Sequence, residues 1–225
     1  MATTPARHPD GAPAVRVLLT GFEPFDGAAH NPSSAAARAA VDLLGRQGVA
    51  ARAVELPCTF AGAGPALRDA LDAALPEVVV AVGLAGGASA VRVERVALNL
   101  QDARIPDTAG EQPVDRPVRR GGPTAHLATL PVKRAVARVR AAGVPAETSL
   151  SAGTFVCNHV MYLLLDDPGT ARKAGFVHVP WSVEHRPTPC TPALPGDDLA
   201  RAVVEVVLAA LDPAPDLAVP EGALH

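Results

Sequence analysis

The chain has 225 residues, of which 48% are hydrophobic and 19% are charged, which suits one large α/β domain with a full core. The net charge of −3 argues against nucleic-acid binding, and no apolar stretch reaches the roughly 20 residues of a membrane-spanning helix. The start of the chain lacks the apolar segment of a secretory signal, and three scattered cysteines fit a reducing compartment, so we expect a cytoplasmic protein.

The spacing of apolar residues predicts strands and helices that alternate along the chain. Strands are expected at 15–20, 51–57, 77–82, 147–151 and 175–180, with 91–100 as a further strand or ribbon. Helices are expected at 34–47, 61–75, 132–142, 159–165 and 197–211, and loops at 102–114 and 181–196. This order favours a single-domain three-layer α/β/α sandwich around a mostly parallel, twisted sheet.

The two ends of the chain differ in composition from the rest. Residues 1–14 are polar and rich in proline and glycine, and we expect them to form a flexible extension. Residues 213–225 are expected to be a loose tail. The domain itself is therefore predicted to span 15–212.

One cysteine stands where a nucleophile would be expected. The small residues 151–154 lead into Cys157, which lies directly before an apolar stretch with the character of a helix. Free N–H groups and the positive end of the helix dipole gather at such a junction and favour a thiolate. Cys58 and Cys190 lack this setting and are interpreted as inert thiols.

A cysteine nucleophile needs a base and a group that orients the base. Among the histidines, His178 is the best candidate, because it lies inside a short apolar strand where an ionisable group needs a reason; a hydrogen-bonded core histidine is an equal alternative. His159 is too close to Cys157 in the helix to face it. Glu94 is the candidate for the orienting acid, although it could instead be a solvated residue on the face of its strand. Asp102, Asp107 and Glu184 are competing candidates for the same role.

The predicted strand ends and the few aromatic residues point to the same region. Phe22, Gly83 and Val179 lie at the carboxyl ends of predicted strands, where active sites of such sheets form. The glycine-rich turn 83–87 matches no phosphate-binding pattern and is interpreted as a tight strand exit. Phenylalanines near the nucleophile indicate a small, apolar, uncharged ligand. The members in question are Phe22, Phe25, Phe155 and Phe176.

Several longer stretches are typical of one known family. They are, in chain order, LLTGFEPFDG with Asn31-Pro32-Ser33, GLAGG, VERVALNLQDARIPDTAGEQP, SAGTFVCNHVMY and GFVHVP. With them the chain resembles the pyrrolidone carboxyl peptidases, the bacterial type I pyroglutamyl peptidases, over nearly all of 17–211.

This resemblance implies a cysteine peptidase that removes the N-terminal pyroglutamyl residue of peptides, without metal or other cofactor. It also implies the sandwich fold, an intracellular setting and a homotetramer. The implied catalytic triad is Glu94, Cys157 and His178. The implied pyroglutamyl pocket maps onto Phe22, Phe25, Ile105, Phe155 and Val156. Asn31 and Arg104 lie in matching motifs and are expected to shape the site, Arg104 near the oxyanion or the substrate backbone.

Two positions depart from the family pattern. Leu84 stands where many bacterial members have glutamine, and Cys58 stands where a threonine is common. Leu84 supports one alternative function, an amidase with the same triad acting on a different small acyl group. A catalytically silent binding protein is the other alternative, and it would need a broken triad.

Overall fold

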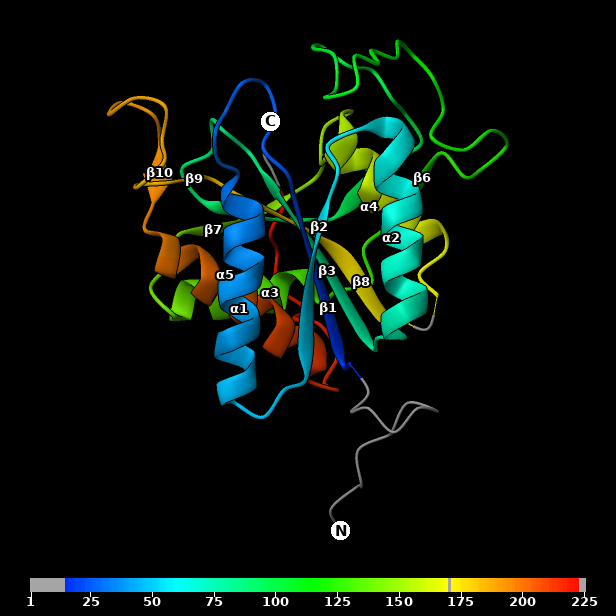
Figure 1. Ribbon diagram of the computed structural model, residues 1–225. Helices are drawn as coiled ribbons and strands as arrows, with labels where there is room; N and C mark the ends of the chain where they lie inside the picture. Colours follow the sequence, from blue (N-terminus) through cyan, green and yellow to red (C-terminus); the bar gives the residue numbers. More distant parts are fainter. Residues whose placement is uncertain (1–14, 170, 223–225) are drawn as a thin grey trace.

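The protein is described by a computed structural model, which covers residues 15–169 and 171–222; the predicted extension at 1–14 and the last three residues of the predicted tail lie outside these ranges. A six-stranded sheet forms the middle layer, and helices cover both of its faces (Figure 1). The predicted three-layer sandwich is therefore confirmed.

The sheet is mostly parallel, with two strands reversed at one side. Its strands are, in spatial order, β2 (Ala51–Leu56), β1 (Val17–Phe22), β3 (Val78–Leu84), β8 (Lys173–Val179), β4 (Val91–Glu94) and β7 (Ala146–Ser149). β2, β1, β3 and β8 are mutually parallel, β4 is antiparallel to β8, and β7 is parallel to β4. The carboxyl ends of β1, β3 and β8 therefore lie together at one end of the sheet, as the predicted parallel strands led us to expect.

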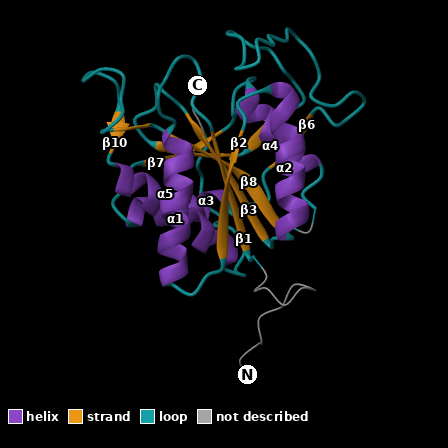
Figure 2. Cartoon of the chain, viewed as in Figure 1, coloured by secondary structure: helices purple, strands orange, loops and turns teal. Residues whose placement is uncertain are grey.

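The helices divide into two groups, one for each face of the sheet (Figure 2). One face carries α1 (Pro32–Arg46), α3 (Val132–Ala141) and α5 (Gly196–Leu211). The other carries α2 (Phe60–Ala74) and α4 (Val156–Asp166). Because each face is covered, the central strand β3 is apolar at nearly every position and almost wholly buried. Helix α4, which carries Cys157, thus packs on the same face of the sheet as α2.

The predicted strand or ribbon at 91–100 is in fact two strands in two sheets. β4 ends at Glu94, and β5 (Val96–Leu98) pairs instead with β6 (Ala125–Leu127) outside the main sheet. Arg95 lies between them; its N–H bonds Ser149 and its carbonyl bonds Ala128. Apolar and polar residues continue to alternate where the chain changes its pairing partner, so the sequence pattern could not reveal the break between β4 and β5. The predicted loop 181–196 likewise contains a small ribbon, β9 (Trp181–Ser182) with β10 (Ala193–Leu194).

The predicted loose tail is wrong for residues 213–222, which lie against α3. Both carboxylate oxygens of Asp216 accept hydrogen bonds from backbone N–H groups of Lys133 and Arg134, at 3.2 and 2.8 Å. Glu221 forms an ion pair with Arg140 at 2.9 Å. Helix α3 has no side-chain cap of its own, so the tail supplies the missing acceptors.

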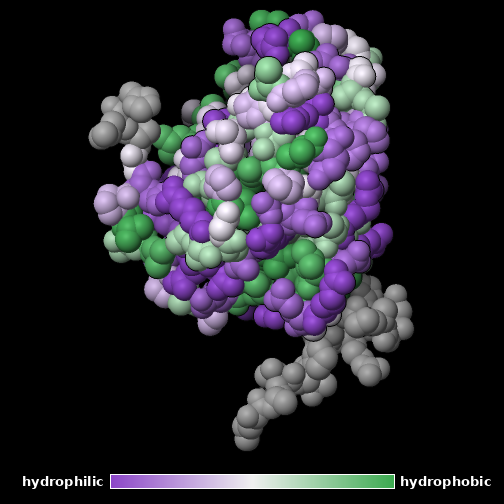
Figure 3. All heavy atoms as spheres, turned by 90° about the vertical axis from the view of Figure 1, so that its left-hand side faces the viewer, coloured by the Kyte–Doolittle hydropathy of each residue, from purple (hydrophilic) through white to green (hydrophobic). Residues whose placement is uncertain are grey.

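Figure 3 shows the face that carries the β9–β10 ribbon and α1, where hydrophilic side chains dominate and hydrophobic ones gather in small areas between them. In the part of the chain that the structure describes, no helix has both the length and the apolar character needed to cross a membrane.

Candidate active site

Cys157 and His178 meet at Gly83, the next-to-last residue of β3. Gly83 is the register partner of His178 in the neighbouring strand. A β-carbon placed on Gly83 would lie only 2.9 Å from Sγ of Cys157, the second residue of α4. Because Gly83 has no side chain, the sulfur of Cys157 fits beside His178.

Glu94 holds the imidazole of His178 from the other side. In the antiparallel pair of β4 and β8, Glu94 lies opposite Phe176, so its side chain shares a face with His178. Its Oε1 lies 2.8 Å from Nδ1 of His178, in a buried position. This hydrogen bond directs Nε2 away from the carboxylate, and within the described residues Nε2 has no hydrogen-bond partner. Glu94 is fully buried, so the alternative of a solvated strand residue is wrong.

The second carboxylate oxygen of Glu94, Oε2, is buried and has no hydrogen-bond partner among the described residues. A buried carboxylate oxygen without a partner is costly, so the carboxylate depends on the bond to His178. That dependence is what an orienting group for a catalytic base requires.

The thiol of Cys157 is less acidic than its place at a helix N-terminus suggested. Burial raises its pKa well above the ordinary value, and the neighbouring Cys58 and Glu94 raise it further, whereas a backbone N–H bond lowers it. Desolvation of the sulfur therefore opposes the effect of the helix end. The expectation that the junction by itself favours a thiolate is corrected here.

Asn158, which the sequence analysis did not single out, fixes the start of α4. Its amide accepts a bond from the N–H of Leu98 at 2.8 Å and donates to the carbonyls of Leu98 and Leu100 at 2.9 and 3.0 Å. These bonds join the helix that carries Cys157 to the chain just after β5. The sequence signal for this role was an asparagine directly after the candidate nucleophile, because a buried side-chain amide needs hydrogen-bond partners for its polar atoms.

The competing site residues are used elsewhere. His159 bonds Gln101 through Nδ1 at 2.7 Å, and burial lowers its pKa to about 4. Asp107 accepts backbone N–H bonds from residues 60, 109 and 111. Glu184 accepts a bond from the N–H of Gly196. Asp102 contacts Thr154 through its backbone. None of these contacts involves Cys157 or His178.

The predicted aromatic residues do gather around the nucleophile. Phe155, directly before α4, lies 6.2 Å from Phe25 and 5.4 Å from Phe60 between ring centroids. Phe176 lies 6.3 Å from Phe22 and 4.8 Å from the ring of His178. Phe60 was missed by the sequence analysis, because its neighbours identify it only as the first residue of a helix.

A cavity of about 570 Å³ opens next to this aromatic group. Four of the predicted pocket residues line it, namely Phe25, Leu84, Arg104 and Ile105. Phe22 and Val156 do not line it and lie in the core behind it, with Phe155 packed against the same core. Trp181, which the sequence analysis did not single out, forms part of its wall.

Asn31 has a structural position behind the loop that carries Phe22 and Phe25. It caps α1 through the N–H of Ser33 at 3.1 Å, and its amide donates to the carbonyl of Glu23 at 3.0 Å. Ser33 Oγ accepts in turn from the N–H of Phe22 at 3.0 Å. Asn31 thereby shapes the site through the backbone of this loop.

Cys58 is a buried neighbour of the nucleophile. Burial and the nearby carboxylates of Glu23 and Asp107 raise its pKa to about 12, so it stays protonated. Among the residues that the structure describes, no group of three or more His, Cys, Asp or Glu could hold a metal ion.

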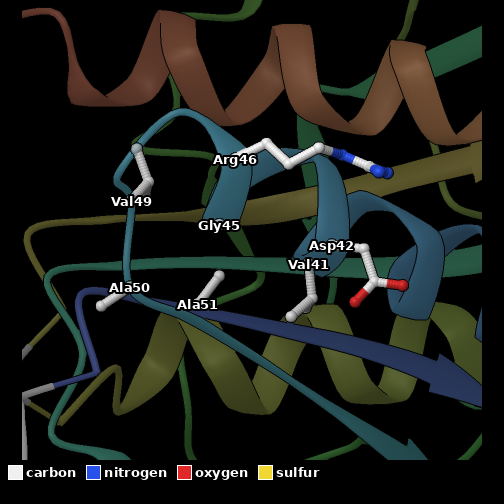
Figure 4. Close-up of a pocket in the computed structure, with 7 residues that line it drawn as sticks. All are labelled: Val41, Asp42, Gly45, Arg46, Val49, Ala50 and Ala51. Carbon is white, nitrogen blue, oxygen red and sulfur yellow. The ribbon is translucent and has the colours of Figure 1, made fainter.

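A second hollow, of about 630 Å³, lies far from these residues (Figure 4). It is lined by the end of α1 and the start of β2, and Asp42 and Arg46 are its ionisable side chains. It is therefore at the opposite end of the strands from Gly83 and contains no nucleophile.

Comparison with known proteins decides the family. A family model described as pyroglutamyl peptidase matches residues 15–212. The chain belongs to the pyroglutamyl peptidase family. The pyrrolidone-carboxylate peptidase of Clavibacter michiganensis is 50% identical over 213 residues, which cover 92% of this chain and 98% of that protein. The enzyme of the same name from Streptomyces coelicolor is 49% identical, over 93% of this chain and 99% of its own.

The fold of this family member agrees with solved structures. The crystal structure of Bacillus amyloliquefaciens pyroglutamyl peptidase I superposes with a TM-score of 0.83 at 36% sequence identity, over 90% of this chain and 99% of that one. The likeness thus extends over most of this chain and nearly all of that one.

Proposed function

We propose that the protein is a cysteine exopeptidase that hydrolyses the bond after an N-terminal pyroglutamyl residue of peptides. The observation that carries this proposal is the buried Glu94–His178 pair, joined at 2.8 Å, with the sulfur of Cys157 against the register partner of His178. Family membership supports the same reaction, since the relatives are pyrrolidone-carboxylate peptidases.

The proposed reaction begins with proton transfer from the Cys157 thiol to Nε2 of His178. This transfer gives a thiolate–imidazolium pair, and the thiolate is the attacking nucleophile. Sγ forms a bond to the pyroglutamyl carbonyl carbon, and the carbonyl becomes an oxyanion. N–H groups at the start of α4, together with Arg104, stabilise that charge.

The second half of the reaction returns the enzyme to its resting state. The oxyanion collapses to a thioester, and the carbon–nitrogen bond breaks while the imidazolium of His178 protonates the leaving amine. His178 then takes a proton from water as the water attacks the thioester, and gives it to the sulfur. Glu94 keeps the imidazole oriented throughout.

Specificity follows from the apolar surroundings of the sulfur. A pyroglutamyl ring is a neutral lactam, and it suits a pocket in which Phe25 and Ile105 supply the wall and Phe22, Phe155 and Val156 lie behind them. A free N-terminal glutamate would bring an ammonium group and a carboxylate, which are costly to bury without partners. Asn31 would act by holding the loop, and Leu84 by contributing apolar surface.

The test is release of a chromophore from a pyroglutamyl anilide by wild type and three variants. We expect activity in wild type and in Cys190→Ser, which changes an exposed cysteine, and none in Cys157→Ser or His178→Ala. A folded, reduced wild type that is inert toward this anilide contradicts the proposal.

Two further measurements separate the alternatives. An amidase for another small acyl group, which Leu84 in the cavity wall would favour, would cleave other acyl anilides faster than the pyroglutamyl one. A silent binding protein would lose nothing measurable on alkylation of Cys157, whereas the proposed enzyme would be inactivated.

We also infer a homotetramer in the cytoplasm, acting on peptides and binding neither nucleic acid nor membranes. The family resemblance supports the tetramer, and the three free cysteines support a reducing compartment. Sedimentation velocity of the reduced protein tests the assembly; a monomer at micromolar concentration contradicts it.

A further inference from the structure

The cavity lined by Phe25, Leu84, Arg104, Ile105 and Trp181 is larger than a pyroglutamyl ring requires. It is an open cavity of about 570 Å³, whereas the ring to be recognised is a single lactam. Of the residues assigned to the ring pocket, only Phe25 and Ile105 line it. Much of its remaining wall comes from the turn after β3 and from Trp181. Most of the residues that line this cavity therefore do not belong to the proposed ring pocket.

Trp181 is connected to the catalytic residues through two neighbouring segments. It follows β8, the strand of His178, and begins β9, which pairs with Ala193 of β10. A β-carbon placed on Gly86 would lie 3.1 Å from Nε1 of Trp181, so the indole lies directly against the turn. Gly83, in β3 just before this turn, leaves room for the sulfur of Cys157, which would lie 2.9 Å from a β-carbon placed there. One short turn thus joins the nucleophile to the indole.

The indole has unused binding capacity on the cavity side. Trp181 is 9% exposed, so nearly all of its surface is covered by protein. Yet within the described residues it stacks on no other aromatic ring, and its Nε1 has no hydrogen-bond partner. Tryptophans in such places normally bond their N–H group. A ligand in the cavity could supply both a carbonyl acceptor and an apolar side chain.

The charges at the cavity are balanced. Asp26 and Arg104 both line it and both are exposed. One is negative and the other positive, so their long-range fields largely cancel. The cavity therefore offers no net attraction for a charged side chain, and its apolar wall decides what it prefers.

We propose that this cavity binds the first residue of the leaving peptide, and that Trp181 is the specificity-determining residue that makes the enzyme prefer a large apolar side chain there. This inference rests on the proposed pyroglutamyl peptidase function. The substrate class is pyroglutamyl peptides whose second residue is leucine-like or aromatic, as opposed to glycine or a charged residue.

The first experiment uses Trp181 as its own reporter, since it is the only tryptophan in the chain. The Cys157→Ala variant, which cannot turn over substrate, is titrated with pyroglutamyl-leucinamide while tryptophan emission is recorded. We expect a saturable change in emission, with little change from pyroglutamate alone. Binding seen by calorimetry without a change in emission would overturn the proposal.

The second experiment compares kcat/KM of wild type for pyroglutamyl-leucinamide, pyroglutamyl-glycinamide and pyroglutamyl-aspartamide. We expect leucine to exceed glycine and aspartate by roughly tenfold or more, the usual value of an apolar side chain in a fitted subsite. Trp181→Ala should bring the leucine-to-glycine ratio close to one, and Trp181→Phe should retain most of it.

The outcomes separate this inference from the function on which it rests. Cleavage of all three peptides at similar rates by wild type overturns the subsite and leaves the pyroglutamyl peptidase intact. Absence of cleavage of any of them overturns the peptidase function, and the subsite with it. If Trp181→Ala does not fold, the wild-type ratio and Trp181→Phe still decide.

Discussion

The carboxylate of Glu94 is held by one hydrogen bond in a fully buried position. Its Oε1 bonds His178 at 2.8 Å, and its Oε2 has no partner among the described residues. Because β4 lies between β8 and β7 and is covered by helices, a charged residue at this position is buried. A role in orienting the base explains why a carboxylate occupies such a costly position.

At this residue we predict that Glu94→Gln lowers kcat/KM on the order of a hundredfold or more, because the neutral amide stabilises the imidazolium of His178 less well. The measurement is hydrolysis of a pyroglutamyl anilide, with thermal unfolding to confirm the fold. Glu147→Gln is the matched control, since Glu147 is a half-exposed acid on the adjacent strand β7. Equal activity of Glu94→Gln and wild type would refute the role of Glu94.

At the scale of elements, α3 and α4 are held at their starts by partners distant in sequence. The start of α4 is fixed by Asn158 to the chain after β5, and α1 is capped by Asn31, which also holds the loop after β1. The start of α3 is capped by Asp216, about eighty residues later. Local sequence therefore indicates where these helices run, whereas the bonds that position them come from elsewhere.

For α3 we predict that Asp216→Ala lowers the free energy of unfolding by about 1 kcal/mol, because two backbone N–H groups of the first turn lose their acceptor. Asp216→Asn keeps an acceptor oxygen and should lose less. Chemical denaturation followed by circular dichroism measures both. An unchanged midpoint for Asp216→Ala would show that the 213–222 segment does not cap α3 in solution.

At the scale of the whole molecule, one hydrophobic core lies on each face of the sheet. Ionisable side chains are buried in the core that contains α2 and α4. His159, a residue of α4, packs against Phe60 of α2, and burial lowers its pKa to about 4. The unfolded chain, with an ordinary histidine pKa of about 6.5, binds a proton in the interval where the folded protein does not. Falling pH therefore favours the unfolded state between these two values.

We predict that the free energy of unfolding falls by up to about 3 kcal/mol as pH is lowered from about 6.5 to 4, and that His159 causes much of this fall. His159→Gln, which can still bond Gln101, should flatten the profile in that interval. Asp166 provides a contrast: burial raises its pKa, but bonds from Arg119 and His126 lower it more, so its contribution is lost only at more acid pH. Denaturation at several pH values tests this, and an identical slope in both proteins would contradict it.

The amino-acid sequence by itself determined the sandwich, the order of its elements and the junction that carries Cys157, because apolar periodicity and small-residue turns act over short stretches of chain. His178 and Glu94 were candidates among alternatives on residue pattern, and family resemblance selected them. The paired geometry of those two residues, the split of 91–100 into β4 and β5, the anchored segment 213–222 and Trp181 in the cavity wall were decided by tertiary structure. The raised pKa of Cys157 belongs to the same group. These features depend on which segments meet and on what is shielded from water, and neither is encoded in a local pattern.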